Sequence, residues 1–451
     1  MLATETACDL RASPKSHEPM ISNIAVRALP DGEAGILETR VTSPVAGGTS
    51  RSVAVRVSGH VLAASGPIQR IEAVVHGHVL ASGVPNEATP DVATRFPATP
   101  WAAHCGFSLL VDTLIQHRSF EFGLPVLLSD GTVVNIASVG GERQALSIEY
   151  ASRLQPLIVN SFGRTGTTLL MRMISAHPQV IVYDRPPYEI RGSKYWMHAL
   201  RVLGTPVDAR SQIGAAMQFH EDPRAAGGNP FYSSGFAAAQ EVEAWSASSY
   251  LTDLVSFCQQ SIDDWYLATA AAQKQPIAPL VFFAEKHFPD LFPRLLRDLY
   301  PGARELFLVR DFRDMIASML AYNAKKGSGD FGRDRVDSDE AWLAYLHQNF
   351  AVLHTAWQQR GEPGSLIRYE DLVREPGVAL TGLLNRLGLD ASPATVADLL
   401  AAAEAPELKG HGSSQSPAAS IGRWREDLSP EMQDMLARTF RELLQGFGYG
   451  E

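Results

Sequence analysis

Short segments in which apolar and polar positions alternate run from about residue 21 to residue 143. The clearest of them cover residues 53–57, 71–76, 107–111, 120–122 and 125–128. Turn-forming steps separate them, among them Gly47–Gly48, Ser65–Gly66–Pro67, Ser82–Gly83 and Asp130–Gly131. Strands this short, interrupted this often, are typical of an antiparallel β-sandwich.

The pattern changes near residue 144. Beyond it, apolar strands alternate with longer amphipathic helices, which predicts a parallel sheet flanked by helices. The expected strands are residues 157–159, 180–183, 280–283, 306–309 and 366–367, with helices and loops over 190–275. The predicted parts are a disordered tail over 1–20, a β-sandwich accessory domain over 21–150 and an α/β domain over 151–451.

A strand, a glycine-containing turn and a helix follow one another over Leu157–Leu170. The turn reads Gly163–Arg164–Thr165–Gly166–Thr167–Thr168. Such a turn directs backbone N–H groups and the positive end of a helix at one point, which favours an anionic group. Thr167 and Thr168 add hydroxyl donors, and Arg164 adds a full positive charge.

This turn departs from the P-loop of nucleoside triphosphatases, GxxxxGK[ST]. Ser161 stands where that motif has its first glycine, and Thr167 follows Gly166 where it has lysine. The lysine that reaches the terminal phosphates is therefore missing, and Arg164 stands two residues before the glycine instead. A kinase-like phosphotransferase also needs Mg²⁺ ligands, and no His, Cys or carboxylate cluster has a ligand spacing.

A second segment with candidate chemistry is Glu305–Ser318. Arg310 ends an apolar strand, and Ser318 lies about two turns into the next helix. Because a guanidinium is planar and bidentate, Arg310 suits a phosphate monoester at the carboxyl edge of an open α/β sheet, where ligands bind. The other charged residues are expected to pair with one another at the helix start: Asp311, Arg313 and Asp314.

Together these segments resemble the sulfotransferase family. The turn at 163–168 resembles its 5′-phosphosulfate loop, with Gly163 where proline is usual, and residues 310–318 resemble its 3′-phosphate signature RDPRDxxxS, with Phe312 in place of proline. Two later stretches agree: Ile367–Leu372 with Glu375–Pro376 resembles the YEDL-xx-P segment, and Ala419–Arg425 resembles the S-x-G-R-W loop that closes over the nucleotide. The likeness covers about residues 154–450.

The resemblance implies transfer of a sulfuryl group from phosphoadenylyl sulfate (PAPS) to an acceptor hydroxyl. The product is adenosine 3′,5′-bisphosphate, and no metal is implied. The positions matching the family's nucleotide-binding motifs are Gly163, Arg164, Thr165, Gly166, Thr167, Thr168, Arg310, Ser318, Gly422, Arg423 and Trp424. The two missing prolines remove no ligand atom, so nucleotide binding is expected to persist.

Transfer also needs charge stabilisation and a base. Arg164 is assigned to the bridging oxygen, and Lys286, expected just after the strand at 280–283, to the sulfonate oxygens. The base candidates, in order of preference, are Glu189, His287 and Asp184. Lys286–His287–Phe288–Pro289 resembles the family's K-x-H-x-P with the lysine shifted by one residue; Asp184 matches the family's catalytic Glu by counting, and Glu189 has the longer reach. Isolated polar residues are expected to have no catalytic role: His220, Asp222 and His411.

Composition narrows the partners and the compartment. A net charge of −10 argues against broad nucleic-acid binding, which needs a basic surface, so any anion must be held by a local cationic cluster. The cysteines Cys8, Cys105 and Cys258 lie far apart, which predicts neither disulfides nor zinc and favours the cytoplasm. Residues 1–20 lack the apolar core of a signal peptide, and no apolar run reaches the roughly 18–20 residues of a membrane span.

Acceptor and oligomeric state are not predicted by these motifs. Sugar, peptide tyrosine, lipid and small phenol all stay open. A carbohydrate or surface-glycan precursor is favoured because residues 1–150 loosely resemble β-rich modules of bacterial surface-carbohydrate enzymes. The rings of Trp101, Phe96 and Phe107 either stack on a sugar or, as the preferred interpretation, pack in a core. A catalytically inactive nucleotide- or carbohydrate-binding protein is the alternative alongside the kinase-like reading.

Overall fold

The computed structural model describes residues 19–28, 34–205, 245–288, 292–362, 364–404, 414 and 416–450. Most of the expected tail over 1–20 lies outside these residues, as do Cys8, His220, Asp222, Pro289 and His411. The chain forms two compact units. Unit 1 comprises Met1–Ser147 and Ala199–Leu254, and unit 2 comprises Ile148–His198 and Val255–Glu451.

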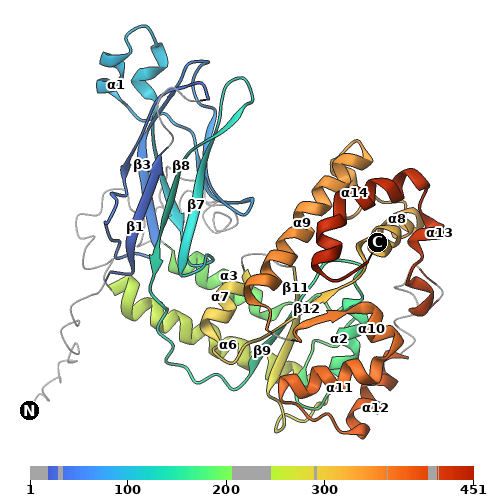
Figure 1. Cartoon of the computed structure of the whole chain (residues 1–451). Coiled ribbons are helices and arrows are strands. Elements are labelled where there is room, and N and C mark those ends of the chain that lie inside the picture. The colour runs from blue at the N-terminus through green and yellow to red at the C-terminus, as the bar shows by residue number, and fades with distance from the viewer. Residues whose placement is uncertain are drawn as a thin grey trace, which may run out of the picture. The chain divides into compact units, whose positions relative to one another are not determined.

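Unit 1 is built on two antiparallel sheets. Strands β1, β8 and β7 of the larger sheet run side by side in Figure 1. The larger sheet has the order β1-β8-β7-β4-β5 and the smaller β2-β3-β6. The strands are β1 (Ile21–Ala28), β2 (Ile36–Ser43), β3 (Ala54–Ala63), β4 (Arg70–Val75), β5 (His78–Gly83), β6 (Gly106–Asp112), β7 (Ser119–Leu127) and β8 (Val133–Arg143). Buried and more exposed side chains alternate along β4 and β7, as in a sheet with one face on a core. The expected antiparallel β fold is confirmed.

A single strand, β7, replaces the two strands expected over 120–122 and 125–128. Its register against β8 shifts between Gly123 and Pro125, where the pairing becomes irregular. Proline has no N–H to donate, so an irregularity of this kind lets a strand continue past it. The expected gap at Gly123 and Leu124 is therefore part of the strand.

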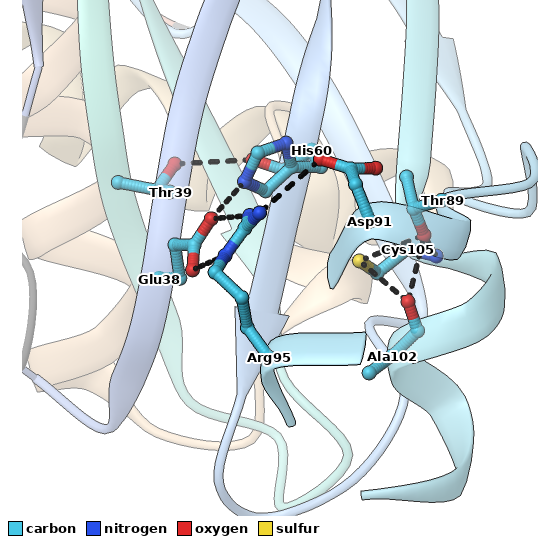
Figure 2. A network of polar contacts seen from close by, with 8 residues as sticks. All are labelled: Glu38, Thr39, His60, Thr89, Asp91, Arg95, Ala102 and Cys105. Atoms are coloured by element: carbon cyan, nitrogen blue, oxygen red, sulfur yellow. Dashed lines mark hydrogen bonds and ion pairs between the residues drawn. The ribbon is translucent and has the colours of Figure 1, made fainter. Parts of the chain in front are cut away.

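A polar network fastens the short helix α1 (Pro90–Arg95) to the smaller sheet, as Figure 2 shows. Arg95 Nε donates to Glu38 Oε2 (3.1 Å), and His60 Nε2 lies 2.7 Å from Glu38 Oε1. The hydrogen bond from Arg95 lowers the pKa of Glu38, and burial opposes that effect. These contacts join β2, β3 and α1 into one structural unit.

The aromatic side chains near α1 pack inside unit 1. Phe96 and Trp101 lie against a buried cluster that contains Leu62 and Cys105, and Trp101 Nε1 donates to the Ala63 carbonyl at 2.9 Å. Trp101 belongs to the short 3₁₀ segment η1 (Pro100–His104). Phe107 on β6 is buried. Core packing, the preferred interpretation of these rings, is confirmed.

A buried ion pair ties residues from beyond position 198 into unit 1. Arg201 Nε donates to Asp112 Oδ2 at 2.6 Å, and Thr205 Oγ1 donates to Asp112 Oδ1 at 3.3 Å. Arg201 belongs to helix α3 (Gly192–Gly204), and Asp112 ends β6. Since both charges are buried, removing either partner leaves an uncompensated charge in the interior.

Unit 2 contains a five-stranded, all-parallel sheet in the order β10-β11-β9-β12-β13. Its strands are β9 (Gln155–Asn160), β10 (Val180–Ile181), β11 (Phe282–His287), β12 (Arg304–Val309) and β13 (Leu366–Arg368). Its helices are α2 (Thr167–Ser175), α7 (Phe292–Leu299), α8 (Phe312–Lys326), α9 (Asp339–Arg360), α10 (Tyr369–Arg374), α11 (Pro376–Leu387), α12 (Pro393–Ala403), α13 (Trp424–Asp427) and α14 (Pro430–Gly446). Helices α3 and α6 (Leu251–Ala272) contribute residues to both units.

Both faces of this sheet are buried under helices (Figure 1). On one face Leu306 and Leu308 of β12 pack with α2, α11 and α12. On the other, Phe307 and Val309 of the same strand pack with α8, α9 and α14. The continuous apolar runs of the sequence follow from this two-sided burial, and the predicted α/β sheet is confirmed.

Two strands differ from their predicted positions. β10 is only two residues long, where 180–183 was expected. β11 runs to His287, so Lys286 and His287 lie within a buried strand and not after it. The prediction ended this strand at Phe283 because charged residues follow; each of them finds a polar partner in the interior, which lets the strand continue.

Candidate active site

The anion-binding turn predicted from the sequence joins β9 to α2. Gly166 caps the helix with φ of 94°, and Arg164 also lies in the left-handed region with φ of 70°. A non-glycine residue at positive φ is a strained feature that collects at functional sites. The hydroxyl of Thr165 donates to the Phe162 carbonyl at 2.8 Å and that of Ser161 to the Leu308 carbonyl at 3.0 Å, which holds the turn in this shape.

Gly166 is required here for a second reason. A Cβ atom at this position would overlap the ring of Tyr369, the first residue of α10. The ring of Tyr369 therefore lies directly against the turn, and its hydroxyl is 3.0 Å from Ser420 Oγ.

Arg310 follows β12 directly and is buried at the carboxyl edge of the sheet. Its Nη1 donates to the Arg164 carbonyl at 3.1 Å, its Nη2 donates to the Ser420 carbonyl, and its guanidinium stacks 4.8 Å from the centre of the Tyr369 ring. Its Nε is buried without a hydrogen-bond partner. Arg310 thus joins the turn to the segment at Ser420, and its Nε–H group remains able to donate to a ligand.

The side chain of Arg164 points to the same place. Its Nε donates to Ser318 Oγ at 3.1 Å, and its guanidinium lies 4.9 Å from the centre of the Tyr322 ring. Burial lowers the pKa of Arg164, and the positive charges of Arg310 and Arg423 lower it further. Arg310 and Arg423 therefore lie close enough to Arg164 to repel its guanidinium, an arrangement that a bound anion stabilises.

The third cation comes from the loop before α13. Arg423 Nη1 donates to Ser414 Oγ at 2.8 Å, and Arg423 also pairs with Asp427. The loop is fastened by Asp314 of α8, whose carboxylate accepts from the backbone N–H groups of Gly422 (2.7 Å) and Trp424 (3.1 Å). Burial raises the pKa of Asp314.

The charged residues at the start of α8 were expected to pair among themselves. Arg313 does pair with Asp311 (2.8 Å), and it also stacks 4.4 Å from the Trp424 ring centre. Asp314 differs, because both its oxygens hold the Gly422 loop. The local spacing predicted the first pair and could not indicate a loop more than a hundred residues away.

The residues assigned to the acceptor side lie on and after β10 and β11. Lys286 is buried, and its Nζ donates to the Pro187 carbonyl (2.7 Å) and to Glu189 Oε1 (3.1 Å). Burial lowers the pKa of Lys286. Asp184 instead pairs at the surface with Arg172 of α2, at 3.2 Å.

His287 ends β11 next to the anion-binding turn. Its carbonyl accepts from the Ser161 N–H at 3.0 Å, and its ring is almost completely buried. The ring Nε2 lies 2.7 Å from Glu285 Oε2, and Nδ1 is buried without a hydrogen-bond partner. Glu285 also accepts from Ser193 and Tyr266.

Comparison with known proteins identifies the family. The family model described as "Sulfotransferase family" matches residues 156–393, just over half of the chain. The chain belongs to the sulfotransferase family. No curated protein matches the sequence significantly.

Solved sulfotransferases are similar to the chain at low identity. One is the sulfotransferase domain from the curacin biosynthetic pathway (18% identity, TM-score 0.35, 65% of this chain and 98% of that one). A second is the sulfotransferase domain from the olefin synthase of Synechococcus PCC 7002 (18% identity, TM-score 0.36, 66% of this chain and 98% of that one). A third is sulfotransferase STF9 from Mycobacterium avium (15% identity, TM-score 0.32, 66% of this chain and 78% of that one).

The sulfotransferase brings most of its predicted nucleotide residues together. The turn at Gly163–Thr168, Arg310, Ser318 and the loop at Gly422–Trp424 meet through the contacts described above. Of the acceptor-side residues, Glu189 meets Lys286, whereas Asp184 and His287 have other partners. The members of the family transfer sulfuryl groups, so the general activity of this chain is sulfuryl transfer.

Sequence reasoning missed Glu285. This carboxylate lies in the middle of a strand whose six residues are all buried, and it organises the polar contacts around His287. The available signal was a charged residue two positions before a histidine inside an apolar run. Such a pair lies on one face of a strand.

Across the described ranges, no three His, Cys, Asp or Glu side chains form a group that suits a metal ion, and a metal-free reaction stays a prediction. None of the helices described combines the length and apolar character of a membrane span.

Proposed function

We propose that the protein transfers the sulfuryl group of PAPS to a hydroxyl of a carbohydrate or surface-glycan precursor. The observation that carries the nucleotide assignment is the gathering of Arg310 and Arg423 near Arg164, whose side chain contacts Ser318, at the carboxyl edge of the sheet. In a chain of net charge −10, Arg310 is buried and Arg164 and Arg423 are partly buried, and such a local group of cations is stabilised by an anionic ligand.

The contacts described above support the following nucleotide-binding roles. Arg310 and Ser318, assisted by Arg423 and the Gly422–Trp424 loop, take the 3′-phosphate. Gly163–Thr168 takes the 5′-phosphosulfate, with backbone N–H groups and the hydroxyls of Thr167 and Thr168 at the start of α2. Arg164 is assigned to the charge that develops on the leaving phosphate, and Lys286 to the sulfonate oxygens.

The base is assigned by comparing the partners of the three candidates. Glu189 is ion-paired with Lys286, and Asp184 with Arg172. Only His287 keeps a buried nitrogen, Nδ1, without a partner, and it lies beside the anion-binding turn. These contacts favour His287 over Glu189, which the sequence ranked first, as the group that accepts the proton of the acceptor hydroxyl.

The acceptor and the setting are part of the same proposal. Support for a carbohydrate acceptor is the separate β-rich unit 1, an accessory module for a large acceptor, with the catalytic residues all in unit 2. Cys105 and Cys258 are buried and form no disulfide, as in a protein of a reducing compartment, which supports the cytoplasm.

Calorimetry with adenosine 3′,5′-bisphosphate, with and without chelator, tests the nucleotide assignment. Binding that survives the chelator supports it, and binding that requires Mg²⁺ favours the kinase-like phosphotransferase. Labelled PAPS with a panel of sugar, phenol, peptide and lipid acceptors then tests transfer. Tight binding with no transfer to any acceptor supports the inactive binding protein, and transfer to phenols or peptides alone contradicts the carbohydrate.

A further inference from the structure

Glu285 is a carboxylate with a complete set of donors in the interior of unit 2. Its Oε1 accepts from the Ser193 backbone N–H (2.8 Å) and from the Tyr266 hydroxyl, and its Oε2 accepts from Ser193 Oγ (2.6 Å). His287 Nε2 lies 2.7 Å from the same Oε2. The side chain is 1% exposed. Four donors on one buried carboxylate are more than packing requires.

The donors come from α3, α6 and β11 itself. Ser193 lies in the first turn of α3, Tyr266 lies on α6, and His287 is two residues along the same strand. Because side chains alternate along a strand, Glu285 and His287 point to one face and Lys286 to the other. Burial by itself raises the pKa of Glu285, but the hydrogen bonds from His287, Ser193 and Tyr266 outweigh it and the pKa is lowered. Glu285 is therefore ionised at neutral pH.

An ionised carboxylate only accepts hydrogen bonds. The short contact between Glu285 Oε2 and His287 Nε2 therefore requires the hydrogen on Nε2. In the neutral imidazole the other nitrogen, Nδ1, then carries the lone pair, and this is the nitrogen that is buried without a partner. The carboxylate thus decides which ring atom can act as a base.

We propose that Glu285 is a positioning residue that orients His287 and fixes its tautomer, so that Nδ1 accepts the proton of the acceptor hydroxyl. This inference rests on the proposed function. In the reaction the acceptor oxygen forms a bond to sulfur while the bond from sulfur to the bridging phosphate oxygen breaks. The leaving oxygen keeps the electron pair, the hydroxyl proton moves to Nδ1, and Glu285 stays ionised beside the imidazolium.

Glu285→Gln tests the proposal because it keeps the shape and changes the hydrogen bonding. The amide oxygen, in place of Oε1, still accepts from the Ser193 backbone N–H and from Tyr266, but the amide N–H₂, in place of Oε2 and next to His287 Nε2, needs an acceptor there. The ring then carries its hydrogen on Nδ1.

Three measurements are made on the full-length Glu285→Gln protein. We expect kcat to fall about 100-fold or more, as for the loss of a tautomer-fixing carboxylate in other enzymes. The KM for the acceptor and the Kd for adenosine 3′,5′-bisphosphate should stay within about threefold, because Glu285 contacts neither. Nitrogen NMR of the His287 ring should show the hydrogen on Nε2 in the wild type and on Nδ1 in the variant.

A double variant separates positioning from general stability. If Glu285 acts through His287, adding Glu285→Gln to His287→Ala should cause no further loss of kcat. Asp263→Asn is the matched control, because Asp263 is also a buried carboxylate of unit 2. It accepts hydrogen bonds from the backbone N–H groups of Arg153 and Leu154, which are not among the site residues. Asp263→Asn should lower the melting temperature without changing kcat or the His287 tautomer.

Tyr266→Phe gives a second, milder variant in case Glu285→Gln does not fold. It removes one donor and leaves the carboxylate, so the Nε2–H tautomer should persist and kcat should fall less than tenfold. The proposal would be overturned if Glu285→Gln had a kcat near that of the wild type or left the His287 tautomer unchanged. It would also be overturned if the double variant had a kcat well below that of His287→Ala alone. A wild type that transfers no sulfuryl group from PAPS refutes the proposed function instead, and the tautomer measurement still reads the role of Glu285.

Discussion

Replacing Arg310 by alanine should weaken the binding of adenosine 3′,5′-bisphosphate by about 10- to 150-fold. The guanidinium is buried, holds the Arg164 and Ser420 carbonyls, and has a free donor at Nε. A hydrogen bond to a charged group contributes about 1.5–3 kcal/mol, and each 1.4 kcal/mol is tenfold in Kd. Loss of one such contact to the 3′-phosphate gives this range.

The assay compares two nucleotides by calorimetry. If Arg310 holds the 3′-phosphate, Arg310→Ala should strongly weaken the binding of the bisphosphate and only slightly weaken the binding of adenosine 5′-phosphate. Arg310→Lys should fall between wild type and alanine, because lysine keeps the charge and loses the planar fork. Arg304→Ala is the matched control, since Arg304 is exposed at the amino end of the same strand; it should leave both affinities unchanged.

One result would refute the reasoning. If folded Arg310→Ala bound the bisphosphate with wild-type affinity, Arg310 would serve only to join the Arg164 and Ser420 carbonyls. Thermal unfolding decides whether the variant is folded: bisphosphate at 100 times its Kd should stabilise the wild type by about 2.7 kcal/mol and the variant by less at the same concentration.

Arg164→Ala should lower kcat by about 100-fold or more while changing bisphosphate affinity much less, because its charge is needed most as the leaving phosphate develops charge; turnover within a few fold of wild type would contradict this. Gly166→Ala should lower the free energy of unfolding, by denaturant titration, by about 1–3 kcal/mol from backbone strain alone, and the clash with Tyr369 should also reduce nucleotide affinity. Sulfuryl transfer should survive excess chelator; loss that Mg²⁺ restores would revive the kinase-like alternative. Deleting residues 1–150 should spare bisphosphate affinity and sharply lower transfer to a large acceptor, provided the truncated chain, in which Arg201 loses Asp112, still folds by circular dichroism.

The sequence predicted the elements whose patterns are local. The strand, turn and helix over Leu157–Leu170 are visible because the apolar run, Gly166 and the helical spacing are contiguous. The same holds for Arg310 after β12. The prediction failed at β11, where the strand continues through charged residues that are buried, and at β7, which runs without a break through Gly123 and Leu124 past an irregularity in its pairing.

What the chain determined by itself is therefore the order of its elements and the positions that carry cationic and hydroxyl groups. Only the tertiary structure decided which of them meet. Arg164 contacts Ser318 across 154 positions, and Asp314 holds a loop 108 positions away. No spacing rule reaches so far, because these contacts depend on how β9 and β12 pair and how helices pack on their faces. The partner of His287 shows the same limit: Glu285 is close in sequence, but its ionised state follows from Ser193 and Tyr266, which packing brings to it.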